Sequence, residues 1–223
     1  MALLPHYKHI VNPKLKHIYL SIDERGTLIV KSPKISQKKI EQFLLKKAAW
    51  INKSKEKIAQ KKGKMPDFSQ EGELYFLGES HSFFLKKHTQ KHTHLVFNGD
   101  TFTLFYGDYD KELFQQKIDL FYKKEAQRYV TPLLYKWSDT MKLPVNRLTF
   151  RKTKRQWGSC STSNNISINT MVMKLPLHVI EYIIVHELAH IQHKHHQKDF
   201  WALVERYVPS YKECIKILKE YTT

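Results

Sequence analysis

The chain has few cysteines and no long apolar run. Its 223 residues include two Cys, Cys160 and Cys214, too few for the disulfide framework of a small secreted protein. No apolar run approaches the ~18 residues that a membrane-spanning helix requires. The first residues, Met1–Lys8, are too short and too polar a stretch for a signal peptide. We therefore expect a cytoplasmic protein with no membrane partner.

Arginine is also scarce. Only six of the 38 basic residues are Arg, although the formal net charge is +17. Basic chains bind nucleic acids through phosphate contacts, but Arg is the residue expected where phosphates are recognised in a bidentate geometry. Lysines dispersed along the whole chain are equally typical of a solvated surface. Nucleic acid or nucleotide stays open as a partner, and no Gly-rich phosphate loop of the Walker type supports it.

Apolar side chains are abundant. They make up 41% of the chain, with 13% aromatic residues, enough to bury a core as one domain or two small ones. In the first half, alternation of apolar and polar residues predicts strands, and a helix with an apolar stripe reaching Trp50 and Ile51 begins at Ser36. The predicted strands cover residues 17–23 and 27–30, joined by a turn at Glu24–Gly26, and residues 74–78, 81–85, 95–97 and 101–106.

Two local signals refine the first half. Asn98-Gly99 lies between the last two predicted strands and is a strong signal for a hairpin turn. The tract His88–His94 is interpreted as a flexible tip, because its histidines have no partners at metal-site spacing on a predicted rigid element.

The second half is predicted to be mainly helical. A long amphipathic helix begins at Asp110, and Pro132 should kink or interrupt it. Strands are predicted over residues 148–151 and 165–169, on either side of a turn at Trp157–Ser159. An edge strand in this position can accept an extended peptide by main-chain hydrogen bonds. The pattern fits an ordinary sheet with Trp157 in the core equally well.

The stretch His186-Glu187-Leu188-Ala189-His190 lies in an apolar helix that begins near Pro176. Two His four residues apart share one face of a helix, so both imidazoles can bind one metal ion. Glu187 then lies beside them, facing the metal-bound water. This arrangement is typical of zinc hydrolases. The alternative, a core helix with unpartnered polar side chains, would cost several kcal/mol.

A catalytic zinc usually has three protein ligands, and the candidates for the third are His193, His195 and His196. The spacing from His190 to His196 equals the second half of the metzincin pattern. His196 can serve only if the helix ends near Lys194. His195 could then form the turn, because His is enriched at positive φ. His193, seven residues from His186, is the weaker alternative.

A set of motifs resembles the YgjP-like metallopeptidase domain family, bacterial zinc-dependent hydrolases that are distantly similar to the SprT-like and WLM proteases. The resemblance is strongest over residues 145–212 and extends to Trp50-Ile51 and Leu77-Gly78. It implies that His196, four residues before Phe200, is the third metal ligand. The residues that carry it are Trp157-Gly158-Ser159-Cys160, Ile168-Asn169, Leu175-Pro176, His186–His190, His196 and Phe200-Trp201.

The sequence therefore predicts an α+β protein. Residues 1–108 form a strand-rich region with one helix, and residues 109–223 a zincin-like metal-binding catalytic region, unless the two make one continuous domain. The predicted function is zinc-dependent hydrolysis of peptides or proteins. His186, His190 and His196 bind Zn²⁺, and Glu187 is the general base. Arg151 or Arg155 could stabilise the oxyanion, but basic residues beside a strand are more often surface charges.

Two other functions stay open. One is metal-dependent hydrolysis of nucleotide phosphoanhydrides. The other is a nucleic-acid-associated module with a structural metal, against which Glu187 argues, since a structural site has no use for a base. The sequence does not fix the oligomeric state.

Overall fold

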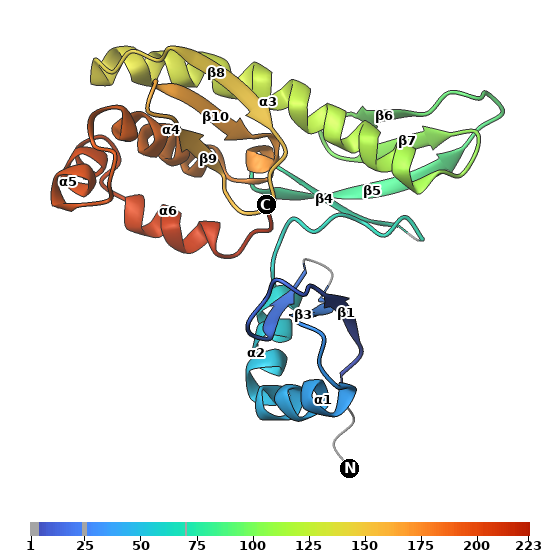
Figure 1. Cartoon of the computed structure of the whole chain (residues 1–223). Coiled ribbons are helices and arrows are strands. Elements are labelled where there is room, and N and C mark those ends of the chain that lie inside the picture. Colours follow the sequence, from blue (N-terminus) through green and yellow to red (C-terminus); the bar gives the residue numbers. More distant parts are fainter. Residues whose placement is uncertain (1–4, 24–25, 70) are drawn as a thin grey trace. The chain divides into compact units, whose positions relative to one another are not determined.

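The computed structural model describes residues 5–23, 26–69 and 71–223. Within them it has six α-helices, one 3-10 helix and ten strands in three sheets, which confirms the α+β class (Figure 1). No helix among the described residues is long and apolar enough to cross a bilayer. The first four residues of the chain and Glu24–Arg25 of the predicted turn lie outside the described residues.

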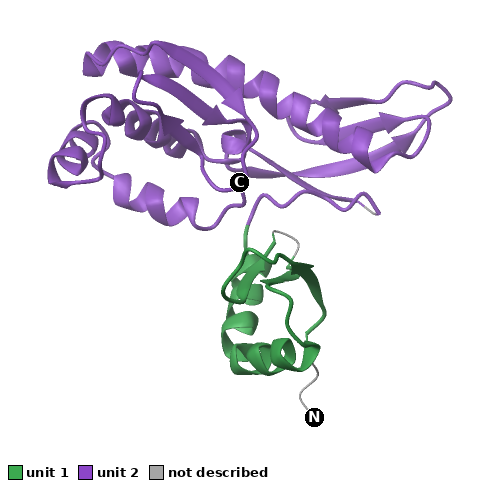
Figure 2. Cartoon of the chain, viewed as in Figure 1, with its two compact units in different colours: residues 1–61 green, residues 62–223 purple. Residues whose placement is uncertain are grey.

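The chain divides into two compact units, residues 1–61 and residues 62–223 (Figure 2). The strands between residues 72 and 106 belong to the second unit, so the boundary expected between residues 108 and 109 lies inside that unit.

The first unit is a three-stranded sheet followed by two helices. Its strands β2 and β3 pair antiparallel, as the predicted hairpin requires, while β1 pairs parallel to β3. Its core consists of Leu28, Val30, Ile40, Leu44 and Ile51. The elements are β1 (Tyr7–Val11), β2 (Tyr19–Ile22), β3 (Leu28–Ser32), α1 (Gln37–Lys46) and α2 (Ala48–Ala59).

The prediction of a single helix after Ser36 is wrong, because the segment forms two helices, α1 and α2. The chain leaves helical geometry at Lys47, with φ −103° and ψ 8°, and this residue separates α1 from α2. Only part of the predicted apolar stripe is buried: Ile51 is fully buried, whereas Trp50, the preceding residue of α2, is 47% exposed.

The second unit begins with a four-stranded sheet in the order β4-β5-β7-β6. The Asn98-Gly99 hairpin is confirmed, since β6 and β7 pair antiparallel on either side of it. β5 and β7 pair parallel, so the segment between β5 and β6 crosses the end of β7. The strands are β4 (Gly72–Phe76), β5 (Glu79–Lys87), β6 (His94–Phe97) and β7 (Phe102–Tyr106).

Helix α3 (Lys111–Met141) is the longest element. The Asp110 carboxylate accepts hydrogen bonds from the N–H groups of Glu112 and Leu113 and caps its first turn. The helix continues through Pro132, so the predicted interruption is wrong. One face is buried at intervals of four residues; it consists of Phe114, Ile118, Tyr122, Ala126, Val130 and Leu134. The helix packs against α4 and η1 and, less extensively, against β6 and β8.

A third sheet, in the order β8-β10-β9, leads into the C-terminal helices. β10 pairs parallel to β8 and antiparallel to β9. The Trp157–Ser159 region, predicted as a turn, instead enters strand β9 at the edge of this sheet. The elements are β8 (Arg147–Arg151), β9 (Gly158–Cys160), β10 (Asn165–Asn169), the 3-10 helix η1 (Thr170–Lys174), α4 (Leu177–Gln192), α5 (Lys198–Tyr207) and α6 (Tyr211–Leu218).

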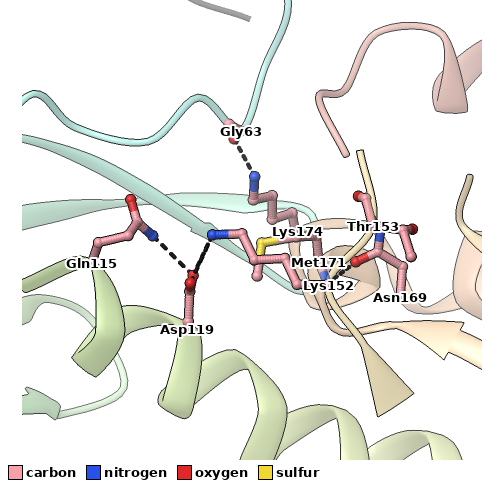
Figure 3. A network of polar contacts seen from close by, with 8 residues as sticks. All are labelled: Gly63, Gln115, Asp119, Lys152, Thr153, Asn169, Met171 and Lys174. Atoms are coloured by element: carbon pink, nitrogen blue, oxygen red, sulfur yellow. Dashed lines mark hydrogen bonds and ion pairs between the residues drawn. The ribbon is translucent and has the colours of Figure 1, made fainter. Parts of the chain in front are cut away.

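Buried polar contacts fix the chain where β10 passes into η1 (Figure 3). The Asn169 side chain accepts a hydrogen bond from the Met171 N–H and donates to the carbonyl of Thr153. Lys174 is fully buried, and its Nζ donates to the Gly63 carbonyl at 2.6 Å. Nearby, Lys152 forms an ion pair with Asp119 of α3 at 2.7 Å. These contacts set the start of α4 relative to the loop that precedes β9.

Candidate metal centre

Helix α4 carries the predicted motif on a helix that is buried on most of its surface. Ile183, Ile184 and Leu188 are at most 3% exposed, whereas Leu177 at the start of the helix is exposed. The helix ends at Gln192, where the His193 N–H donates to the Ala189 carbonyl. His196 can be the third metal ligand only if the helix ends near Lys194, and the observed end meets that condition.

The structure brings His186, His190 and His196 together. One ring nitrogen of each lies within 4.8 Å of the other two. The Nε2 atoms of His186 and His196 are 3.1 Å apart. Two nitrogens bound to one tetrahedral zinc at 2.0–2.1 Å would be separated by about 3.3 Å. The His186 and His196 nitrogens therefore already have nearly the spacing that a shared metal ion demands, and the His190 nitrogen lies within 4.8 Å of both.

Hydrogen bonds to the second ring nitrogens determine which nitrogen faces the centre. The His190 Nδ1–H donates to the His193 carbonyl at 3.1 Å. The His186 Nδ1 lies 3.3 Å from the hydroxyl oxygen of Tyr182, one turn earlier on α4. With Nδ1 protonated, Nε2 of each ring keeps its lone pair. Such outer contacts commonly orient metal-binding histidines.

Burial keeps two of these imidazoles neutral. Desolvation, together with the neighbouring His190 and His196, lowers the pKa of His186 to about 3. Desolvation also lowers the pKa of His190. A neutral imidazole is the form that can bind a metal, so no proton has to be displaced at neutral pH.

Two aromatic residues of α5 position His196. Phe200 is fully buried, and its ring centre lies 4.6 Å from that of His190 and 4.7 Å from that of His196. The Trp201 ring stacks on His196 at 5.7 Å. The start of α5 thus holds the otherwise exposed His196 ring against α4.

Glu187 is 6% exposed and lies against strand β9. Burial raises the pKa of its carboxyl to about 8. A divalent cation close by would favour the carboxylate again. Gly158 leaves the space that Glu187 occupies, because a Cβ at position 158 would lie 2.7 Å from Glu187 Cγ and Oε1. Gly158 and Tyr182 are contacts that sequence reasoning missed. The i, i+4 spacing from Tyr182 to His186 was the available signal for the second.

The other candidates lie outside the cluster. His193 ends α4 and contributes its carbonyl to the bond with His190. His195 is exposed and is not among the described residues with positive φ, so the predicted turn geometry is wrong. The turn instead contains a hydrogen bond from the Gln197 N–H to the His195 carbonyl at 2.8 Å. Arg151 and Arg155 are both exposed.

Comparisons with known proteins give one family. A family model described as YgjP-like, metallopeptidase domain, matches residues 16–221. A search of curated proteins gave no match. Among solved structures, the chain is similar to the crystal structure of the metallopeptidase zymogen of Pyrococcus abyssi abylysin. The identity is 25% over 42% of this chain and 99% of that chain, with a TM-score of 0.38.

Proposed function

The chain belongs to the YgjP-like metallopeptidase domain family, a family of metal-dependent peptidases, and we propose that it is a zinc peptidase centred on α4. His186, His190 and His196 hold the metal ion, and Glu187 is the general base. The observation that carries the proposal is the convergence of three imidazole nitrogens within 4.8 Å beside a buried carboxyl group.

The donor set fits zinc. Three neutral imidazoles are the protein ligands of known catalytic zinc sites, which keep a fourth position open. The contacts of His186 with Tyr182 and of His190 with the His193 carbonyl leave Nε2 as the coordinating atom of each ring. When bound, the metal supplies Lewis-acid chemistry, polarising a substrate carbonyl and acidifying water.

Glu187 performs the proton transfers. Its carboxylate accepts a proton from the attacking water and then delivers it to the leaving amine. Its position next to Gly158 fixes the carboxylate against β9. The protonated form needed for the second transfer is produced by the first, because the carboxyl group keeps the proton taken from water until the amine leaves.

Strand β9 is the element on which a peptide substrate would lie. It is one of the two edge strands of its sheet, and it contacts α4. An extended peptide can add to such an edge by main-chain hydrogen bonds. Because Gly158 of β9 touches Glu187, a peptide bound there would pass close to the base.

Glu187→Gln tests the proposed role of the base. The amide keeps the size of the side chain but cannot accept the proton of water. Zinc content and melting temperature should stay close to those of the unaltered chain, and hydrolysis of peptides selected from a library should fall by roughly 10²–10⁴-fold.

The same zinc-loaded protein should be assayed against nucleoside triphosphates. Peptide hydrolysis that depends on Glu187 supports the peptidase. Triphosphate hydrolysis without any peptide hydrolysis would replace it with the phosphoanhydride alternative. Loss of zinc from Glu187→Gln would show instead that the carboxyl group is a ligand or a structural partner.

A further inference from the structure

A second group of three histidines lies at the tip of the β4–β7 sheet, away from α4 (Figure 1). One ring nitrogen each of His88, His92 and His94 lies within 4.8 Å of the other two. The sequence predicts a flexible tip whose histidines lack partners at metal-site spacing, and in the structure the three histidines lie together. We propose that His88, His92 and His94 form a second metal site, for a divalent transition-metal ion such as zinc.

The backbone explains why these rings meet. β5 and β6 are separated in the sheet by β7, so residues 88–93 must cross the end of β7. The His88 N–H donates to the Tyr106 carbonyl at 2.9 Å. Gly107 lies directly against the crossing segment, because a Cβ there would be 2.4 Å from the Gln90 carbonyl oxygen. The segment is therefore packed on β7, and it places one histidine at each end and one between.

The rings themselves are packed. His94 stacks on Phe105 with ring centres 4.9 Å apart, and His92 stacks on His94 at 4.9 Å. Nδ1 of His94 and Nε2 of His88 are shielded from solvent and have no hydrogen-bond partner in the described part of the chain. Shielded polar nitrogens normally have a partner. A metal ion between the rings would provide one.

The ligand chemistry selects the metal. Imidazole nitrogens suit zinc, copper and nickel, whereas magnesium and calcium require oxygen ligands. His88 Nδ1 accepts a hydrogen bond from the Gln90 N–H at 3.0 Å. Coordination through Nε2 needs the ring proton on Nδ1, so metal binding replaces that contact. The crossing segment would then be clamped to the sheet by the metal.

The charged residues around the His88, His92 and His94 cluster affect its expected affinity for zinc. His88 lines a surface hollow together with Lys87, Lys91 and Asp108. The two ammonium groups disfavour a cation, while the carboxylate is a candidate fourth ligand. We therefore expect this site to bind zinc more weakly than the cluster on α4.

The test uses the full chain carrying His190→Ala and His196→Ala, which leaves a single histidine of the α4 cluster. Calorimetric titration with Zn²⁺ should show one ion per chain, and zinc should raise the melting temperature. Adding His92→Ala should weaken binding at least tenfold and abolish the rise. His92 is exposed, so its replacement should leave the metal-free melting temperature unchanged. Adding His178→Ala, another exposed histidine of the same unit, is the matched control.

Two results would overturn the proposal. One is the absence of zinc binding by the His190→Ala, His196→Ala chain. The other is equal binding with and without His92→Ala, which would place the ion elsewhere. Neither result bears on the α4 site, because the test removes that site from the start.

Discussion

At the scale of single residues, the geometry of the α4 cluster depends on contacts that lie outside the motif. Phe200 and Trp201 hold the His196 ring, and Tyr182 contacts the far nitrogen of His186. Such outer contacts commonly tune metal affinity by 10–100-fold. The five-residue motif alone therefore does not define the site.

His196→Ala should remove most of the bound metal from the α4 cluster, because it deletes one of three converging nitrogens. His195→Ala should have little effect, since that side chain is exposed. His193→Ala should also have little effect, because His190 contacts only its carbonyl. Metal analysis of the three purified variants, each also carrying His92→Ala, checks this. A greater loss from His193→Ala than from His196→Ala would contradict the ligand set.

Gly158→Ala should lower peptide hydrolysis at least tenfold and leave the zinc content unchanged. The added methyl group would lie 2.7 Å from Glu187 Cγ, so the carboxyl group must move while the three histidines need not. Small displacements of a catalytic group cost about this much. The readout is turnover and metal content, with Ser159→Ala on the same strand as the control. Unchanged turnover would show that Glu187 has room to adjust.

At the scale of elements, α3 has one buried face and packs against several elements, α4 and η1 among them. The length of α3 depends on its ends as well as on that face. Its first turn is capped by Asp110, whose carboxylate accepts two backbone N–H groups. The negative charge of the Asp110 carboxylate also interacts favourably with the positive end of the helix dipole.

Asp110→Ala should reduce the free energy of unfolding of residues 62–223 by about 1 kcal/mol, the usual cost of a lost N-cap. Asp110→Asn should retain most of the stability that Asp110→Ala loses, because the amide oxygen accepts the same hydrogen bonds. Urea unfolding followed by circular dichroism measures both. An equal loss in the two variants would assign the effect to charge and not to the cap.

At the scale of the whole molecule, the two units have separate buried cores. All six histidines of the two clusters lie in residues 62–223. A bound metal stabilises the folded state of the unit that binds it, by roughly 4 kcal/mol at a thousandfold excess over Kd.

Zinc should accordingly slow hydrogen exchange in residues 62–223 and leave the exchange of residues 1–61 unchanged. Exchange measured by mass spectrometry on zinc-loaded and chelator-treated protein checks this, with the His92→Ala, His190→Ala, His196→Ala chain as the insensitive control. Equal protection of both units would show that they unfold together.

Several features could be predicted from sequence because they depend on neighbours a few residues apart. The position of His186 and His190 on one face of a helix, with Glu187 beside them, follows from helical periodicity. The Asn98-Gly99 hairpin follows from turn chemistry. The start of α3 after Asp110 follows from the apolar pattern of that segment.

Other features depend on pairing between distant segments, which short-range patterns do not encode. The edge position of β9 beside Glu187 requires β10 to pair with both β8 and β9. The gathering of His88, His92 and His94 requires the crossing over β7. The break at Lys47 and the continuity of α3 through Pro132 show tertiary packing overriding local propensity. The sequence by itself determined which side chains α4 carries and at what spacing, because helical periodicity is local, and the order of strands in the sheets decided what surrounds them.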